Sequence, residues 1–412
     1  MILPEHGRSD AEILGELDAL RARDARWQDG RTFGLVFDGG PEARHIAERV
    51  ATMFLHENAL NTAAFPSLAR IQADVVAMCT DLFHGPAGAA GFMTSGGTES
   101  ILMAVKAARE RARAERGVTT PNIVLAESAH AAFHKAAYDF GLEVRSTPVD
   151  SGFRADPDAV SERIDDRTAL VVGSAPQYPQ GVIDPVPELA RLAESVGASM
   201  HVDACMGGFV LPFMELAGEP VPPWDFRVPG VTTISADVHK LGYAPKGASV
   251  IVHRTKELRR YQTFVFDDWL GGFYASPNMQ GSRAGLPMAT AWAVMQRIGR
   301  DGYIDLTRTT IATARKIADA VRATPGLRVL GSPDAHLLAV AGDGLDAFAV
   351  GDALIARGWY LDRQTPPDAL HLTVSAGNAP VVDTFLADLA DAVAAASGTR
   401  ATDRSTDYST LD

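Results

Sequence analysis

Short apolar segments alternate with helical segments between about residues 70 and 255, and this alternation constrains the fold more than any other feature. The apolar segments are rich in Val and Ile and are flanked by turn residues; they lie at 122–127, 169–175, 199–204, 231–235 and 248–253. Between several of them the apolar residues recur with the period of a helix, as in 98–115 and 186–197. This pattern predicts an α/β fold with a mostly parallel central sheet that helices cover on both faces.

The chain on either side of this region has a different character. Residues 1–57 read as two helices joined by a glycine-containing loop, and residues 58–300 hold the alternating region that should form a large domain. Beyond residue 300, helical stretches flank short strands, which predicts a smaller α+β domain over 301–396. Residues 397–412 contain almost no large apolar side chain, so we expect them to form a disordered tail.

Charge and composition exclude several classes of protein. The 412 residues carry a formal net charge of −13, which argues against a nucleic-acid surface because phosphate binding requires clustered Lys and Arg. Only two cysteines occur, so no disulfide framework is expected, and no metal site is predicted. No segment approaches the roughly 20 apolar residues of a membrane span, and the N-terminus lacks a secretory signal. We therefore expect a cytoplasmic protein without a membrane anchor.

Two residues that follow apolar strands carry the first chemical signal. Asp203 ends the strand in SMHVDA, and Lys240 follows another apolar strand in VTTISADVHKLG. The carboxyl ends of neighbouring parallel strands are where α/β folds bind their ligands. Pyridoxal phosphate (PLP) chemistry needs such a pair, because a lysine amine holds the cofactor as a Schiff base and a buried carboxylate keeps its pyridine nitrogen protonated. Each residue alone is commonplace, since most lysines are exposed and an Asp after a strand is usually a turn residue.

A glycine-rich turn supplies the third element. The segment TSGGTES (94–100) places Gly96, Gly97 and Thr98 at the start of a predicted helix, where free N–H groups and the positive end of the helix dipole form an anion site. Such a turn is weak as a signal by itself. The three elements in this order, however, predict a PLP enzyme with its cofactor on Lys240. We expect burial and the nearby cofactor to lower the pKa of Lys240, so that the free amine is available.

Two histidines have two readings each. His130 follows the strand NIVLAE, again at a carboxyl end. Its imidazole could stack on the pyridine ring and transfer protons, or it could be a helix-start residue with a satisfied hydrogen bond. His239 precedes Lys240 and could donate to the cofactor phosphate, with the same structural alternative.

Longer segments around these residues resemble a known family. They are TSGGTESILMAVKAARE, HVDACMGGFVLPF, SADVHKLGYAPKGASVIVHR and GGFYASPNMQGSRAG. Together they resemble the sphingosine-1-phosphate lyases, within the group II PLP-dependent decarboxylase superfamily, over about residues 30–390. The motifs SGGTES, HVDA and HK are shared with the decarboxylases, whereas the APKG segment and YASP…GSR point more narrowly to the lyases.

The resemblance implies a fold, an assembly and a set of roles. The fold would be the type I PLP fold, and the assembly an obligate homodimer with active sites at the subunit interface, to which residues 1–57 would contribute. Lys240 would be the Schiff-base lysine, Asp203 the partner of the pyridine nitrogen and His130 the stacking residue. The other implied roles are cofactor phosphate binding by Gly97, Thr98 and His239, joined by Gly281 and Ser282 from the partner chain, proton transfer by Tyr178, and substrate phosphate binding by Lys246.

Three departures from the family pattern concern the substrate. The lyases typically read GAVY where this chain reads GLVF, so a tyrosine is replaced by Phe37. They read NPLH where this chain reads NALN, so a phosphate-binding histidine is replaced by Asn61. They commonly read PQFPHG where this chain has Gln180. Lys246 remains, but the other two expected phosphate contacts are changed.

The sequence thus predicts a PLP-dependent carbon–carbon lyase that cleaves a phosphorylated sphingoid base into a long-chain aldehyde and phosphoethanolamine. Phe37 and Asn61 leave open a different amino alcohol or β-hydroxy amino acid as the substrate. An amino-acid decarboxylase is the alternative on the same scaffold, with Arg283 or Arg363 as the cation for the substrate carboxylate. A third interpretation is a protein that binds the cofactor without catalysing a reaction. Such a protein would be expected to have lost Lys240 or Asp203, and both residues are present.

Overall fold

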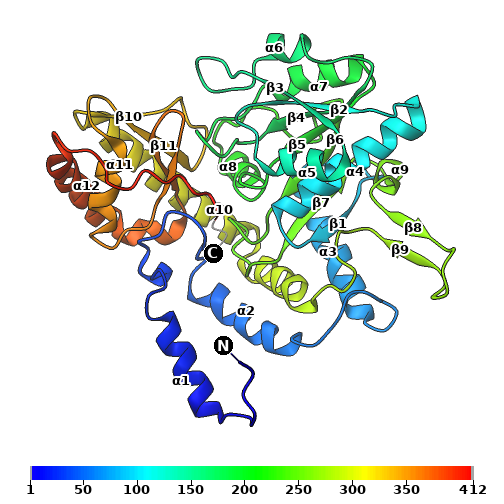
Figure 1. Ribbon diagram of the computed structural model, residues 1–412, viewed down its shortest axis with the longest axis horizontal. Helices are drawn as coiled ribbons and strands as arrows, with labels where there is room; N and C mark the ends of the chain where they lie inside the picture. Colours follow the sequence, from blue (N-terminus) through cyan, green and yellow to red (C-terminus); the bar gives the residue numbers. More distant parts are fainter. Residues whose placement is uncertain (1, 410–412) are drawn as a thin grey trace.

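The computed structural model describes residues 2–409, and its centre is a seven-stranded sheet (Figure 1). The strands lie in the order β1-β7-β6-β5-β4-β2-β3. Their bounds are β1 Ala90–Thr94, β2 Asn122–Ala126, β3 Glu143–Thr147, β4 Thr168–Ser174, β5 Ser199–Asp203, β6 Val231–Ala236 and β7 Ser249–His253. Neighbouring strands from β3 to β6 are parallel, and β7 runs antiparallel to both β6 and β1. The predicted α/β fold with a mostly parallel sheet is confirmed.

Helices cover both faces of this sheet, as the residues of β2 show. Ile123 and Leu125 pack into one buried cluster with α4 and α5, whereas Val124 and Ala126 pack into another with α3, α7 and α8. Successive side chains of a strand point to opposite faces, so both faces are buried and the strands are continuous apolar runs. The bounds of these helices are α3 Pro66–Leu82, α4 Gly97–Arg116, α5 Ala132–Phe140, α7 Val186–Ser195 and α8 Leu211–Leu216.

A second, antiparallel sheet lies in the C-terminal part of the chain. Its strand order is β10-β11-β13-β12. The elements are β10 Leu327–Val329, β11 Leu337–Gly342, α11 Ala347–Ile355, β12 Asp362–Gln364, β13 Ala369–Thr373, η2 Ala376–Val381 and α12 Val382–Ala396. This unit has its own buried cluster, in which Phe33 from the N-terminal segment packs against Phe385 with ring centroids 4.7 Å apart. The N-terminal segment therefore helps to complete the small C-terminal domain.

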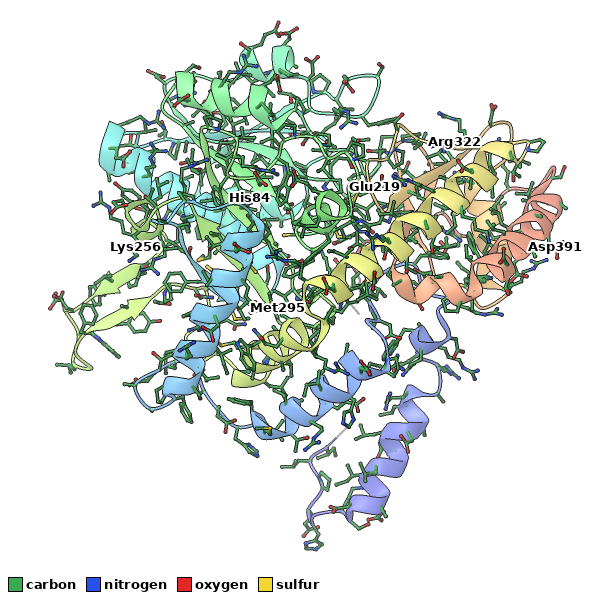
Figure 2. All side chains as sticks on the ribbon, turned by 180° about the vertical axis from the view of Figure 1, so that it is seen from behind. His84, Glu219, Lys256, Met295, Arg322 and Asp391 are labelled. Atoms are coloured by element: carbon green, nitrogen blue, oxygen red, sulfur yellow. The ribbon has the colours of Figure 1, made fainter. Side chains whose placement is uncertain are left out.

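One long helix, α10 (Gly285–Ala323), joins the two domains. Residues such as Val294 and Met295 pack into the core of the large domain, and Ile317 and Val321 pack into that of the small domain. Met295 and Arg322 mark the two parts of α10 in Figure 2. The helix is interrupted at Gly299, whose φ of 64° belongs to the left-handed region that glycine tolerates. The break lies beside the boundary expected at residue 300.

Two peripheral elements stand away from the body of the molecule (Figure 1). Helix α1 (Asp10–Arg21) begins with a capping box at Ser9 and Glu12 and buries none of its residues. A hairpin of β8 (Phe264–Phe266) and β9 (Tyr274–Ser276) extends from the other side. Between these elements lies α2 (Pro41–Met53), which packs along α10. The remaining short elements are η1 Trp27–Asp29, α6 Pro157–Ser161 and α9 Lys256–Arg260.

The expectation of a disordered tail over 397–412 is corrected for residues 397–409. This segment has almost no regular secondary structure, yet it is held against the small domain by ion pairs that connect Arg404 with Asp346 and Asp368. Its Tyr408 enters the active-site region described below. Polar anchoring rather than apolar burial fixes the segment, which is why its composition suggested disorder. Residues 410–412 lie outside the described residues.

No helix within residues 2–409 combines the length and the apolar character needed to cross a membrane.

Candidate active site

Asp203 and Lys240 lie at the same edge of the central sheet. Asp203 is the last residue of β5, and it pairs in register with Ser174 of β4 and Ser235 of β6. Lys240 lies in the turn that follows β6, four residues after the strand ends at Ala236. The carboxyl ends of these parallel strands thus bring together two residues that are distant in sequence.

The carboxylate of Asp203 is fixed by its neighbours. The side chain is buried, and its Oδ1 accepts hydrogen bonds from the Cys205 N–H at 3.0 Å and from the Ser235 hydroxyl at 3.4 Å. Ser235 also contacts Nε2 of His201 at 3.1 Å. Burial lowers the pKa of His201 to about 4, so this imidazole is neutral and does not compete for the charge of Asp203.

Lys240 is paired with a carboxylate that the sequence analysis did not single out. Its Nζ lies 3.0 Å from Oδ2 of Asp237, which is buried. Burial acts to lower the pKa of Lys240, but the surrounding groups, first among them the Asp237 carboxylate, act in the opposite direction, and the pKa is raised overall. In the chain by itself, the pKa of Lys240 is thus raised, although burial acts in the expected direction. The signal was present in SADVHK, because Asp237 stands three residues before the lysine, one turn away.

The glycine-rich turn comes close to the same carboxylate. A Cβ atom on Gly97 would lie 2.9 Å from Oδ2 of Asp237 and 2.9 Å from Sγ of Cys205, so any larger residue would force the turn or these side chains to shift. A Cβ on Gly96 would lie 3.4 Å from Cε1 of His239. Gly97 and Thr98 open α4, whose first N–H groups have no partner within the helix. The turn therefore presents free donors directly beside the Lys240 pair.

The buried carboxylate of Glu99 holds this turn in place through hydrogen bonds. Glu99 accepts a hydrogen bond from the Ser95 N–H at 2.6 Å and another from the Met279 N–H at 2.9 Å. It thereby joins the start of α4 to the segment that leads to Gly281 and Ser282.

His239 and Lys246 flank the Lys240 turn. The Ala248 N–H donates to Nδ1 of His239 at 3.2 Å, which leaves the ring proton on Nε2. Burial lowers the pKa of His239 to about 4, so the ring is neutral. Lys246 donates to the His239 carbonyl at 2.9 Å, and its Nζ lies 4.9 Å from the ring centre of Phe37. Burial, with a smaller effect from Lys240, lowers the pKa of Lys246 to about 8, so this amine remains mostly charged at pH 7.

His130 faces the same centre from the end of β2. The Ala132 N–H donates to its Nδ1 at 3.1 Å, and its Nε2 lies 3.0 Å from the hydroxyl of Tyr408. The proton is thus on Nε2, and burial lowers the pKa of His130 despite the nearby carboxylate of Asp203. Sequence reasoning missed Tyr408, because a tyrosine in a polar C-terminal tail carries no local signal.

Tyr178 lies in the loop after β4 and is held by the small domain. Its hydroxyl donates to Oδ2 of Asp362 at 3.0 Å, and its ring stacks on His371 with centroids 3.9 Å apart. The rings of Tyr178 and Tyr408 meet edge to face at 5.3 Å. Asp362 and His371 were also missed by the sequence analysis. Residues Tyr178, Asp362 and Tyr408 line a cavity of about 410 Å³.

Three of the expected residues are not brought to this centre by the described chain. Asn61 is exposed, and its side chain accepts from the Ala63 N–H. Ser282 is also exposed and contacts the side chain of Asn58 at 3.4 Å, and Gly281 lies beside it.

The arrangement fits pyridoxal phosphate by its chemistry. An amine, a buried carboxylate at the end of a neighbouring strand and a closely packed glycine turn at a helix start are the three groups the cofactor needs. In addition, Oδ1 of the buried Asp237 has no hydrogen-bond partner in the described part of the chain, so the pocket retains an unsatisfied acceptor. Among residues 2–409, no group of three or more His, Cys, Asp or Glu could hold a metal ion.

Comparisons with known proteins agree with this chemistry. The family model described as the pyridoxal-dependent decarboxylase conserved domain matches residues 11–341. A sphingosine-1-phosphate lyase of Oryza sativa subsp. japonica is 42% identical over 95% of this chain and 74% of its own length. The solved structure of a sphingosine-1-phosphate lyase of Burkholderia pseudomallei is 41% identical and covers 96% of this chain and 93% of its own, with a TM-score of 0.92.

A more distant structure shows how general the fold is. The glutamate decarboxylase of Lactobacillus brevis is 23% identical, covers 96% of this chain and 95% of its own, and has a TM-score of 0.83. That similarity concerns the fold alone. The higher identities above extend over nearly the whole chain, and the range that the family model matches contains Lys240 and Asp203. This chain is a PLP-dependent lyase and belongs to the sphingosine-1-phosphate lyases within the pyridoxal-dependent decarboxylase family.

Proposed function

We propose that this protein cleaves the C2–C3 bond of a phosphorylated sphingoid base to give a long-chain aldehyde and phosphoethanolamine. The observation that carries the proposal is the convergence of Lys240, Asp203 and Gly97 at one edge of the sheet, in a chain about 40% identical to sphingosine-1-phosphate lyases over nearly its full length.

Each of these residues has a distinct part in holding the cofactor. Lys240 would bind it through its amine, and the fixed carboxylate of Asp203 would keep its pyridine nitrogen protonated. The N–H groups of Gly97 and Thr98, at the positive end of α4, would hold its phosphate, with the Nε2–H of His239 as a further donor. Once bound, pyridoxal phosphate accepts the electron pair that bond cleavage releases at the substrate's α-carbon.

The remaining residues of the site orient the substrate and move protons. His130 is neutral and carries its proton on Nε2, so it can lie against the cofactor ring without adding charge. Tyr178 carries a hydroxyl that can transfer the proton of the substrate's 3-hydroxyl. The ammonium of Lys246 would bind the substrate's phosphate.

Phe37 and Asn61 bear on how tightly a phosphate is held. Phe37 has no donor, although its ring supports the Lys246 ammonium through a cation–π contact. Each charge-assisted contact that is lost lowers the binding free energy by roughly 1.5–3 kcal/mol. Two losses would weaken affinity by a factor on the order of 10² to 10⁴. A smaller β-hydroxy amine is therefore the alternative substrate on this site.

Amino-acid decarboxylation is the less favoured reaction. It requires a cation for the substrate carboxylate, and both candidates are engaged elsewhere. Arg283 donates to the side chain of Gln72 at 3.0 Å and to the Ala59 carbonyl at 3.2 Å. Arg363 is paired with Asp352, and its side chain is 7% exposed.

The active form is proposed to be a cytoplasmic homodimer. Helix α1 exposes Ile13, Leu14, Leu17 and Leu20, and the β8–β9 hairpin exposes Trp269, Leu270 and Phe273, which gives each chain two apolar surfaces suited to a second copy. A partner chain would also supply Gly281 and Ser282 to the cofactor phosphate. Sedimentation velocity on the purified protein tests this assembly, and a monomer at micromolar concentration would contradict it.

A pair of turnover assays tests the proposed reaction. Purified, PLP-loaded protein is given sphingosine-1-phosphate or unphosphorylated sphingosine, and the long-chain aldehyde and CO₂ are measured. Aldehyde from the phosphorylated compound alone supports the proposal. No aldehyde from either, with a normal cofactor absorbance band, would contradict it. The search would then move to smaller β-hydroxy amines and to amino acids, and CO₂ released from an added amino acid would favour decarboxylation.

A further inference from the structure

Two side chains of the small domain contact Tyr178 at three points. Asp362 of β12 and His371 of β13 are direct cross-strand partners in the small-domain sheet. Oδ2 of Asp362 accepts the Tyr178 hydroxyl at 3.0 Å, and the His371 ring stacks on the phenol ring at 3.9 Å. Nε2 of His371 lies 2.8 Å from the backbone carbonyl of Tyr178. The hydroxyl, ring and backbone of a large-domain residue are thus held by one pair of small-domain side chains.

The direction of the phenol hydrogen bond fixes what Tyr178 can do. A phenol has a single hydrogen to donate, and here it points to the Asp362 carboxylate. The lone pairs of the Tyr178 oxygen are therefore left to accept a hydrogen bond from another group. Burial, followed by the nearby carboxylate of Asp362, raises the pKa of Tyr178. The phenol consequently stays protonated at neutral pH. Its oxygen can accept a proton from the substrate only if the hydrogen that it already carries moves to another group.

We propose that Asp362 is a positioning residue that orients the Tyr178 hydroxyl and receives its proton during bond cleavage. This inference rests on the proposed function. The O–H bond of the substrate's 3-hydroxyl breaks, and its hydrogen moves to the Tyr178 oxygen. The hydrogen already on that oxygen moves to Oδ2 of Asp362. The electron pair left on the substrate oxygen forms the aldehyde C=O bond, and the electron pair of the C2–C3 bond is the one that the cofactor accepts. Asp362 ends neutral and returns the proton along the same path when the carbon is protonated.

The surroundings of Asp362 suit this part. Burial raises the pKa of its carboxyl, while hydrogen bonds from Tyr178 and Tyr360 act in the opposite direction. A raised pKa makes the carboxylate a better proton acceptor. Arg363, its neighbour in sequence, directs its guanidinium to Asp352 and so does not neutralise it.

The other titratable groups nearby do not change charge near neutral pH. Burial lowers the pKa of His371 to about 4 and that of His336 to about 3, so both rings are neutral. Tyr360 has a pKa that burial raises, so it remains protonated. Tyr408 is also protonated at neutral pH, because a phenol ordinarily loses its proton at about pH 10. Protonation of Asp362 would remove the proton acceptor of Tyr178, so kcat should fall as the pH is lowered through the raised pKa of this carboxyl.

The test compares Asp362→Asn with Asp362→Glu, Tyr178→Phe and the double variant Asp362→Asn with Tyr178→Phe. Asp383→Asn is the matched control, because Asp383 is an exposed small-domain aspartate paired with Lys316. For each, kcat and KM for the phosphorylated substrate, the pH profile of kcat, the cofactor absorbance band and the melting temperature are measured.

We expect Asp362→Asn to lower kcat by a factor on the order of 10² to 10³, within the range for a positioned proton-transfer group, with little change in KM or in the absorbance band. Its acid limb should disappear, Asp362→Glu should recover part of kcat, and the double variant should lose no more than Tyr178→Phe alone. The control should match the wild type.

Two outcomes would overturn the inference, and they differ from failure of the proposed function. A kcat within twofold of the wild type with an unchanged acid limb would remove Asp362 from proton transfer. Additive losses in the double variant would show that it does not act through Tyr178. If the wild type itself yields no aldehyde from the phosphorylated substrate, the proposed function fails first, and this inference falls with it.

Discussion

Nζ of Lys240 lies 3.0 Å from Oδ2 of Asp237, and this pair determines the charge of the residue that binds the cofactor. Burial alone would lower the pKa of the lysine, but the adjacent carboxylate raises it. The pKa of Asp237 is lowered in turn, because the Lys240 ammonium and hydrogen bonds to the carboxylate act against its burial. The ammonium group of Lys240 must therefore lose its proton to form the free amine, although the Asp237 carboxylate stabilises the charged form.

Replacing Asp237 with Asn should move the loading of cofactor to lower pH. The carboxylate stabilises the ammonium form, so its removal lowers the Lys240 pKa and the free amine appears at a lower pH. The measurement is the rate of covalent attachment of pyridoxal phosphate to cofactor-free protein as a function of pH, followed by absorbance. Asp383→Asn serves as the control for a lost carboxylate on the surface. An unchanged pH midpoint in Asp237→Asn would contradict the pairing seen here.

Gly97→Ala should weaken cofactor binding. The added methyl would lie 2.9 Å from both Oδ2 of Asp237 and Sγ of Cys205, so either the turn or the carboxylate must shift. We expect the Kd for pyridoxal phosphate to rise by a factor of about ten or more, equivalent to about 1.4 kcal/mol. Gly88→Ala is the matched control, because nothing lies within 4 Å of its added methyl. Equal affinities for the two variants would show that the turn does not border the cofactor.

The parts of the site that could be predicted from sequence are those that the central sheet places locally. Asp203 ends a strand and Lys240 follows one, so knowing the strands sufficed to bring them to one edge. The glycine turn is likewise contiguous with its helix. Both faces of this sheet are buried, and its strands were therefore visible as apolar runs.

The residues that escaped prediction reach the site from elsewhere. Asp362 lies in a strand of three residues, too short to show a period, and His371 is a buried residue of β13 whose neighbours in sequence do not suggest a role. Tyr408 comes from a tail whose polar composition indicated disorder. Their positions depend on how the small domain docks against the large one, which no local pattern encodes. Asp237 is different, because it lies within the motif SADVHK beside Lys240, yet no role was predicted for it.

Restoring donors at positions 37 and 61 should tighten binding of a phosphorylated substrate. Phe37→Tyr places a hydroxyl beside Lys246, and Asn61→His supplies an imidazole that can be cationic. Each change should lower KM for the phosphorylated substrate by roughly tenfold, provided that KM reflects binding, and leave KM for the unphosphorylated compound unchanged. Steady-state kinetics with both compounds makes the comparison. Equal effects on the two substrates would indicate that neither position faces the phosphate.

Arg404→Ala should release the C-terminal segment from the small domain. Arg404 pairs with Asp346 at 2.8 Å and with Asp368, and this anchoring precedes Tyr408 by four residues. Exposed ion pairs contribute little to global stability, about 1 kcal/mol or less, so the melting temperature should change little. Loss of the anchor should instead free Tyr408 from its 3.0 Å contact with His130 and lower kcat. Limited proteolysis should cut the tail of Arg404→Ala faster than that of the wild type. Arg400→Ala is the control and should behave as the wild type, because Arg400 is exposed and its side chain makes no hydrogen bond or ion pair with the described residues. Rapid cleavage with an unchanged kcat would show that the tail is held at the site without serving catalysis.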